Sequence, residues 1–385
     1  MTAHVNHRLH DDIRYFGGKD VDGCMNCGAC TTTCPLSENA GGGFPRRVIR
    51  LIQTGQSDRL AANTDPWLCY YCGECSTHCP RQANPAETMM AARRYLTARY
   101  DWTGLARLFY QSAWAEIAAI CAVGLLVAGL FIGWHGPVVL QRVALNTFAP
   151  VRAVEVGDWI MAGLLSFFLL SNAFRMVRWS LGEDVRRISA AVYWRQIPTF
   201  FLHLFTQKRW RQCGSPQGGL RWFKHLLLVS GYLSMLTLVL ILLRWFQTDH
   251  IYPFYYPQRL WGYYAAIALL YPTVDFMISR WRRKEPIHRF SEASDWIFLI
   301  MLFLTALTGL LVNLVRINGW ALATYVIYVL HLAIAVPMLV VEVPFGKWSH
   351  LLYRPLAIYL RGVQEAAAVE RGAPALAPGA AVSSS

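Results

Sequence analysis

Charged residues are scarce in this chain, and acidic ones are the scarcer kind. Only 15% of the 385 residues are charged, and 23 Asp and Glu stand against 36 Lys and Arg, which gives a formal net charge of +13. A nucleic-acid-binding protein would carry such basic residues on a soluble domain, and the 55% hydrophobic content argues against that class. The combination indicates a membrane protein whose Lys and Arg collect in cytoplasmic loops.

The N-terminal stretch lacks the apolar core of a secretory signal peptide. We therefore expect no cleavable signal, and we expect residues 1–105 to stay in the cytoplasm. This segment holds eight of the ten cysteines. Thiols remain reduced in the cytoplasm, so metal binding is favoured over disulfide formation. No internal repeat is visible apart from the cysteine motif.

The eight cysteines form two copies of the spacing C-x2-C-x2-C-x3-C-P. Three thiolates at this spacing bind three irons of a [4Fe–4S] cubane, and the fourth ligates the other cluster. The predicted ligand sets are Cys24, Cys27, Cys30 and Cys79 for one cluster, and Cys34, Cys69, Cys72 and Cys75 for the other. The alternative is a pair of zinc sites, which is disfavoured because structural zinc joins two C-x2-C halves across a longer gap.

The segments around the motifs have helical patterns. Residues 44–62 place Pro45 in a first turn and Val48, Ile49 and Ile52 on one face. Residues 84–100 begin with Asn-Pro-Ala-Glu, which is typical of a helix start. We therefore predict an all-α fold, with an α-helical two-cluster ferredoxin domain at residues 1–105.

Residues 106–360 contain six apolar runs, each near the ~20 residues that a bilayer requires. The predicted spans are 114–134, 156–176, 225–245, 260–279, 295–316 and 321–345. Lys and Arg concentrate after the second, fourth and sixth runs, so the positive-inside rule places these ends, the cluster domain and the C-terminus in the cytoplasm. We expect a multi-pass protein of the cytoplasmic (inner) membrane. An interfacial helix at 193–207 and a disordered tail at 361–385 complete the prediction.

Two histidines, His225 and His350, lie at the cytoplasmic ends of the third and sixth predicted spans. They share a depth but come from different helices, and neutral imidazoles in this arrangement suit bis-histidine ligation of haem b. The two residues are therefore candidate ligands of one haem.

His331 lies inside the sixth predicted span, where ionisable groups are rare and usually functional. An ideal helix would separate it from His350 by about 28 Å, a depth that suits a second haem. His203, His135 and His250 are the candidates for its partner ligand. The alternative is that His331 forms a hydrogen bond to a neighbouring helix.

The fusion of these cysteine and histidine patterns resembles the C subunit of the quinone-interacting membrane-bound oxidoreductase of sulfur-metabolising microbes. In that family a domain similar to the heterodisulfide reductase C subunit precedes a haem b domain similar to the nitrate reductase gamma subunit. Besides the cysteine motifs, the matching stretches are KHLLLVSGY (224–232), FLTALTGL (303–310) and PFGKWSH (344–350). The last two also resemble the tricarballylate-utilisation protein B group. That group has a second histidine near the outer end of the helix that here starts at His225, where this chain has Arg244-Trp245.

The resemblance implies a membrane electron-transfer subunit with two [4Fe–4S] clusters, one or two haems b and no substrate chemistry of its own. Its implied partners are membrane lipid, quinone, and soluble flavin and iron–sulfur subunits linked to adenylylsulfate reductase, with no nucleic acid. Quinone chemistry needs proton exchange, for which the candidates are Asp275, Asp295, Glu342 and Lys347. Two alternatives stay open: a tricarballylate-type subunit that reoxidises a flavoprotein dehydrogenase, and a non-redox membrane anchor.

Overall fold

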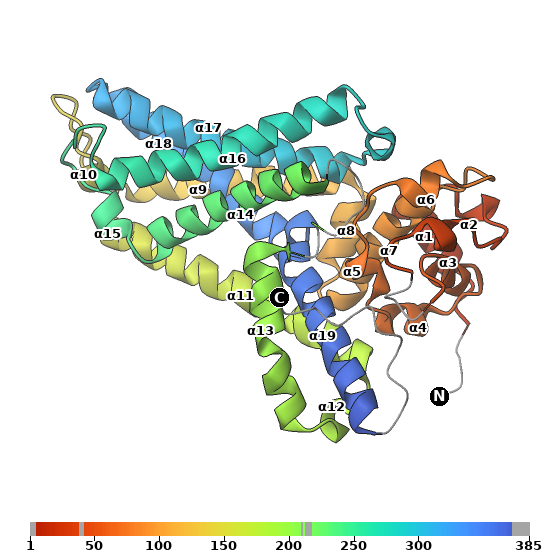
Figure 1. The fold of residues 1–385 in the computed structure, drawn as a ribbon. Helices are drawn as coiled ribbons and strands as arrows, with labels where there is room; N and C mark the ends of the chain where they lie inside the picture. The colour runs from red at the N-terminus through yellow and green to blue at the C-terminus, as the bar shows by residue number, and fades with distance from the viewer. Residues whose placement is uncertain (1–4, 38–41, 209–210, 212–217, 372–385) are drawn as a thin grey trace.

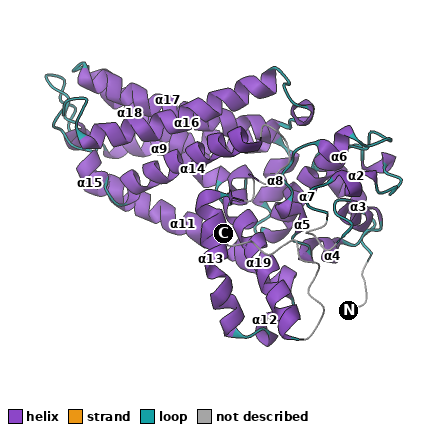
Figure 2. Cartoon of the chain, in the orientation of Figure 1, coloured by secondary structure: helices purple, strands orange, loops and turns teal. Residues whose placement is uncertain are grey.

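Helices make up all the regular secondary structure in the described part of the chain (Figure 2), which confirms the predicted all-α fold class. The computed structural model describes residues 5–37, 42–208, 211 and 218–371. Figure 1 shows three groups of elements: short N-terminal helices, a bundle of long helices, and a pair of helices that runs steeply across the bundle direction.

The N-terminal domain consists of short helices around a shared core. Its helices are α1 (Leu9–Tyr15), η1 (Val21–Gly23), α2 (Ala29–Thr33), α3 (Arg46–Gln53), α4 (Ser57–Ala62), α5 (Asp65–Leu68), α6 (Glu74–Thr77) and α7 (Pro85–Tyr100). The segment between the cysteine motifs forms α3, which buries Val48, Ile49 and Ile52 on one face as predicted. The expected helix at 84–100 is α7, with Pro85 and Glu87 in its first turn.

Long apolar helices form the second group. Five described helices are long and apolar enough to cross a membrane: α9 (Ala113–Trp134), α11 (Val151–Leu181), α14 (Gly218–Leu240), α17 (Ala293–Ile317) and α18 (Ala321–Glu342). The fourth predicted span corresponds to α16 (Pro257–Trp281), which packs against α14 and α17 but is less apolar and is not one of the five. The five helices indicate a membrane protein, and the fourth predicted span, at α16, stays a prediction.

Short elements connect the long ones. They are α8 (Leu105–Gln111), α10 (Leu145–Phe148), α12 (Asp184–Arg187), α15 (Leu243–Phe246), η3 (Pro286–Phe290) and η4 (Lys347–Ser349). Helix α8 leads directly from the N-terminal domain into α9, so these two parts of the chain lie close together.

The helical conformation is interrupted between α18 and the last helix, α19 (His350–Glu370). Helix α18 ends at Glu342, and Pro344 and Gly346 precede η4 before α19 starts. His331 and His350 therefore lie on different helices. The separation predicted for them from one continuous helix is wrong, because a proline and a glycine interrupt the helix between them.

Helix α19 pairs with α13 (Ala190–Thr206), which occupies the predicted interfacial segment. On α19, Leu360, Val363 and Ala367 recur every three or four residues and are buried. This apolar face keeps residues 361–370 helical. The predicted disordered tail therefore does not begin at 361. Residues 372–385 of the predicted tail lie outside the described residues.

The N-terminal domain packs against one end of the bundle through a buried carboxylate, Asp295, in the first turn of α17. Arg94 of α7 contacts it at 3.3 Å, Arg280 of α16 at 3.7 Å, and Lys347 of η4 also forms an ion pair with it. One acidic group thus connects the N-terminal domain to three segments of the membrane half. These ion pairs fix the position of the cysteines of the N-terminal domain relative to the histidines of the membrane half.

Candidate functional site

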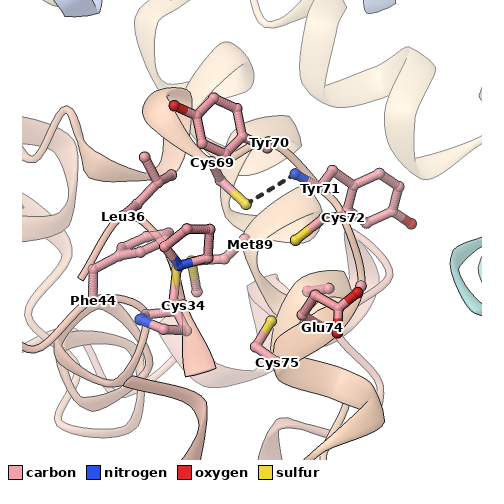
Figure 3. A pocket seen from close by; sticks show the side chains of 14 residues that line it. Cys34, Leu36, Phe44, Cys69, Tyr70, Tyr71, Cys72, Glu74, Cys75 and Met89 are labelled. Carbon is pink, nitrogen blue, oxygen red and sulfur yellow. Dashed lines mark hydrogen bonds between the residues drawn. The ribbon is translucent and has the colours of Figure 1, made fainter. Parts of the chain in front are cut away.

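Four cysteines from both motifs line one small cavity in the N-terminal domain (Figure 3). They are Cys34 of the first motif and Cys69, Cys72 and Cys75 of the second. Gly73 has φ +86°, a left-handed conformation that lets α6 begin directly after Cys72. The backbone N–H of Tyr71 donates to Cys69 Sγ at 3.3 Å. The structure thus brings together the four side chains that the spacing assigned to one cluster.

The other four cysteines also share an environment. Burial raises the pKa of Cys30, and the nearby thiols of Cys24, Cys27 and Cys79 raise it further. Burial likewise raises the pKa of Cys34 to about 12, with additional contributions from Cys69 and Cys72. Bound iron supplies the positive charge that keeps such thiols deprotonated. These neighbours agree with the crossed arrangement, in which each motif lends its last cysteine to the other group, and the ligand assignment stays a prediction.

Among the residues the structure describes, no group of three or more His, Cys, Asp or Glu side chains is placed to hold one metal ion. The four sulfurs in Figure 3 instead surround a space. A cubane cluster fills such a space with its own irons and sulfides, whereas structural zinc needs four ligands converging on one point.

A second and much larger cavity, of about 750 Å³, lies between the N-terminal domain and the bundle. Tyr70 and Tyr71, which flank the cluster ligands in the sequence, line both this cavity and the cysteine cavity. Hydrophobic side chains from α14, α16 and α17 form much of its wall: Leu228, Val229, Leu269, Phe298, Leu299 and Leu302. Its size falls within the range of about 300–1,000 Å³ that is usual for sites of small molecules and cofactors.

His225 from α14 and His350 from the start of α19 both face this cavity. Their ring centres lie 6.3 Å apart, with the ring planes inclined by 70°. The Nδ1 atom of His350 bonds to the carbonyl oxygen of Lys347, which leaves Nε2 as the acceptor nitrogen. Burial lowers the pKa of His350 to about 3, so the imidazole stays neutral, the form that binds metals.

The spacing of the two rings fits one iron between them. Two metal–nitrogen bonds of about 2.0–2.1 Å, plus roughly 1 Å from each nitrogen to its ring centre, give a separation of about 6 Å. Basic side chains that line the cavity suit the carboxylates of a haem: Arg93, Arg221, Lys224, Arg280, Lys284 and Arg354. Some of these already have acidic partners, since Lys224 contacts Asp275 at 2.8 Å. The residues present therefore fit a bis-histidine haem.

The remaining predicted histidines have surroundings of their own, and His203 shares a pocket with one member of this pair. His331 Nδ1 lies 2.9 Å from Thr308 Oγ1 on α17, which matches the hydrogen-bonded alternative. His203 is buried on α13 and lines a small pocket together with His350. His135 stacks on Phe148, and His250 packs against Tyr252.

Arg93 and Arg354 are functional candidates that the sequence did not single out. Both donate hydrogen bonds to the backbone carbonyl of Cys69, and the Arg354 bond is 3.2 Å long. Arg354 follows His350 by four residues, which is one helical turn. This spacing places Arg354 on the same helix face as His350 and could have identified it from the sequence. Burial lowers the pKa of Arg93, although the nearby Cys69 raises it.

Comparison with known proteins supports the N-terminal assignment. Residues 20–83 match the 4Fe-4S dicluster domain family. A protein of Archaeoglobus profundus described as similar to the C subunit of heterodisulfide reductase is 33% identical over 99 residues, which cover 26% of this chain and 53% of that protein. The chain thus spans about half the length of that relative. No solved structure matches. The chain therefore carries an iron–sulfur domain similar to that of a redox-complex subunit, joined to membrane helices.

Proposed function

We propose that the protein is a membrane electron-transfer subunit that connects a soluble redox partner to the quinone pool. Electrons pass through two [4Fe–4S] clusters and one haem b held by His225 and His350. The observation that supports this most strongly is that Tyr70 and Tyr71 line both the cysteine cavity and the histidine cavity. Two cofactors separated by one layer of side chains are close enough for electron transfer.

Hydrogen bonds also connect the two sites. The carbonyl of Cys69 accepts from Arg354, which lies one turn after His350 on α19. Arg93 of α7 binds the same carbonyl. These contacts connect the Cys69 backbone to α19, the helix that carries His350. They therefore keep the distance between the two sites constant.

The chain's own residues define what happens in the large cavity. His225 and His350 would hold the iron of a haem, and the aliphatic and aromatic side chains of the wall would shield it from water. When bound, a haem supplies reversible one-electron chemistry, which can link one-electron clusters to a two-electron quinone. We propose one haem rather than two, because His225 and His350 are the predicted histidines whose rings the structure places at ligand spacing.

The basic loops support the orientation in the membrane that we propose. Lys and Arg after α11 and α16 favour a cytoplasmic location for that end of the bundle, and the N-terminal domain packs at the same end. The soluble partner would then be cytoplasmic. The likeness to the heterodisulfide reductase C subunit and the sequence resemblance together favour flavin and iron–sulfur subunits, and we propose adenylylsulfate reductase as their source or acceptor of electrons.

A reduced-minus-oxidised optical spectrum of the purified full-length protein tests this function. We expect a haem b α-band that disappears in His225→Ala and in His350→Ala and persists in the matched control His331→Ala. Iron analysis should give about eight non-haem irons per chain. Membranes containing intact protein without haem, or a protein with zinc in place of iron, would refute the proposal.

A further inference from the structure

Two glutamates are buried side by side at the end of the bundle that meets the N-terminal domain. Glu116 lies in the first turn of α9, and Glu342 is the last residue of α18. Their exposed fractions are 2% and 0%. Each carboxyl group keeps one buried oxygen without a hydrogen-bond partner, Glu116 Oε2 and Glu342 Oε1, and the two groups interact electrostatically. The surroundings are apolar, with Phe109, Val341 and Phe345 in one hydrophobic cluster beside them.

Glu342 Oε2 accepts the backbone N–H of Lys347 at 2.9 Å. Glu342 Oε1 and Glu116 Oε2 are buried and have no hydrogen-bond partner. Two ionised carboxylates are both acceptors and cannot satisfy each other. One proton shared between these two oxygens would satisfy both of them.

The helix ends determine which glutamate carries the proton. The N-terminus of α9 favours a negative charge on Glu116, whereas the C-terminus of α18 disfavours one on Glu342. Glu342 therefore donates and Glu116 accepts. In this state the pair holds one proton and one negative charge in an apolar setting. A buried charge is costly without a compensating partner, so the pair readily takes up a second proton.

The pair lies directly behind the wall of the large cavity. Tyr110 of α8, Asp295 of α17 and Lys347 of η4 line that cavity and are also the charged or titratable groups that face the pair. The backbone of Lys347 touches Glu342 on one side and His350 on the other. A change of charge inside the cavity thus acts on the pair across one layer of residues.

We propose that Glu116 and Glu342 form a proton-binding site coupled to the redox state of the cofactor between His225 and His350. This inference rests on the proposed function. When one electron enters the cavity from the clusters, the pair takes up one proton from the cytoplasmic side. When the electron leaves, the proton is released. A quinone becomes a quinol by taking two electrons and two protons, so two such cycles supply one proton with each electron.

Infrared spectroscopy of the full-length protein tests the shared proton. At a pH above the pKa of Glu87, which is raised to about 7, the wild type should still show the C=O stretching band of a protonated carboxylic acid, and Glu342→Gln should lose it. The matched control is Glu155→Gln, which removes a carboxylate that pairs with Arg244 at 2.6 Å and should keep the band. A wild type without the band, or a band that survives in Glu342→Gln, would overturn the proposal.

The pH dependence of the haem midpoint potential tests the coupling. Full coupling of one proton to one electron changes the reduction equilibrium tenfold per pH unit, or about 59 mV. Glu116→Gln should flatten the pH dependence of the wild type, and Glu116→Asp should restore part of it, with haem absorbance per chain confirming folding. Equal slopes in wild type and Glu116→Gln would overturn the coupling. A protein that keeps the infrared band but binds no haem would instead refute the proposed function, and the redox-linked uptake with it.

Discussion

Removing the Arg354 side chain should loosen the contact between the cluster domain and the helix that carries His350. Arg354 donates to the carbonyls of Trp67 and Cys69, each at 3.2 Å. A hydrogen bond from a charged donor contributes about 1.5–3 kcal/mol. The Cys69 carbonyl keeps its bond from Arg93, so we expect Arg354→Ala to cost about 2–4 kcal/mol rather than the full sum.

Hydrogen–deuterium exchange of the segment 64–75 measures this cost. A loss of about 2–4 kcal/mol raises the local opening constant by roughly 30- to 1,000-fold. Arg354→Lys keeps the charge but cannot reach both carbonyls with one planar fork, so we expect an intermediate value. Arg99→Ala removes an exposed ion pair with Asp58 and should change exchange little. Unchanged protection in Arg354→Ala would refute the role assigned to this arginine.

Three further predictions concern the N-terminal domain. Cys34→Ser should lower the non-haem iron from about eight to about four per chain, because only the cluster bound mainly by the second motif loses a ligand; loss from the other cluster instead would contradict the crossed assignment. Trp67→Ala should destabilise the domain by about 3–5 kcal/mol, since Trp67 is 2% exposed and packs 5.1 Å from the ring of Tyr353; thermal unfolding measures this. Burial raises the pKa of Glu87 from 4.5 to about 7, so stability should fall as pH rises through this interval and the slope should be absent in Glu87→Gln.

Local spacing explains which parts of the fold could be predicted from the sequence. The cysteine motifs, the helix after Pro85 and the long apolar runs are each encoded within a few turns of chain, and each has its expected helix or cluster of side chains. The pairing of His225 with His350 was predicted from their common depth. It did not require knowledge of the packing, because hydrophobic length fixes how deep a residue lies.

Features that depend on how distant segments meet were not predicted. The break at Pro344 and Gly346 separates His331 from His350, and only the fold shows that Thr308 is the partner of His331. Helix α19 extends beyond residue 361 because α13, far away in the sequence, covers its apolar face. Glu342 was a predicted proton-exchange candidate, but Glu116 gave no signal, since the pair exists only where α9 meets α18.

The central claim is that electrons leave the clusters through the cofactor between His225 and His350. The most direct test starts with fully reduced, full-length protein in liposomes and adds an oxidised, membrane-soluble quinone analogue while cluster and haem absorbance are followed together. We predict rapid reoxidation of the clusters in the wild type and in His331→Ala, and clusters that stay reduced far longer in His350→Ala. Clusters that reoxidise equally fast in His350→Ala would contradict the claim.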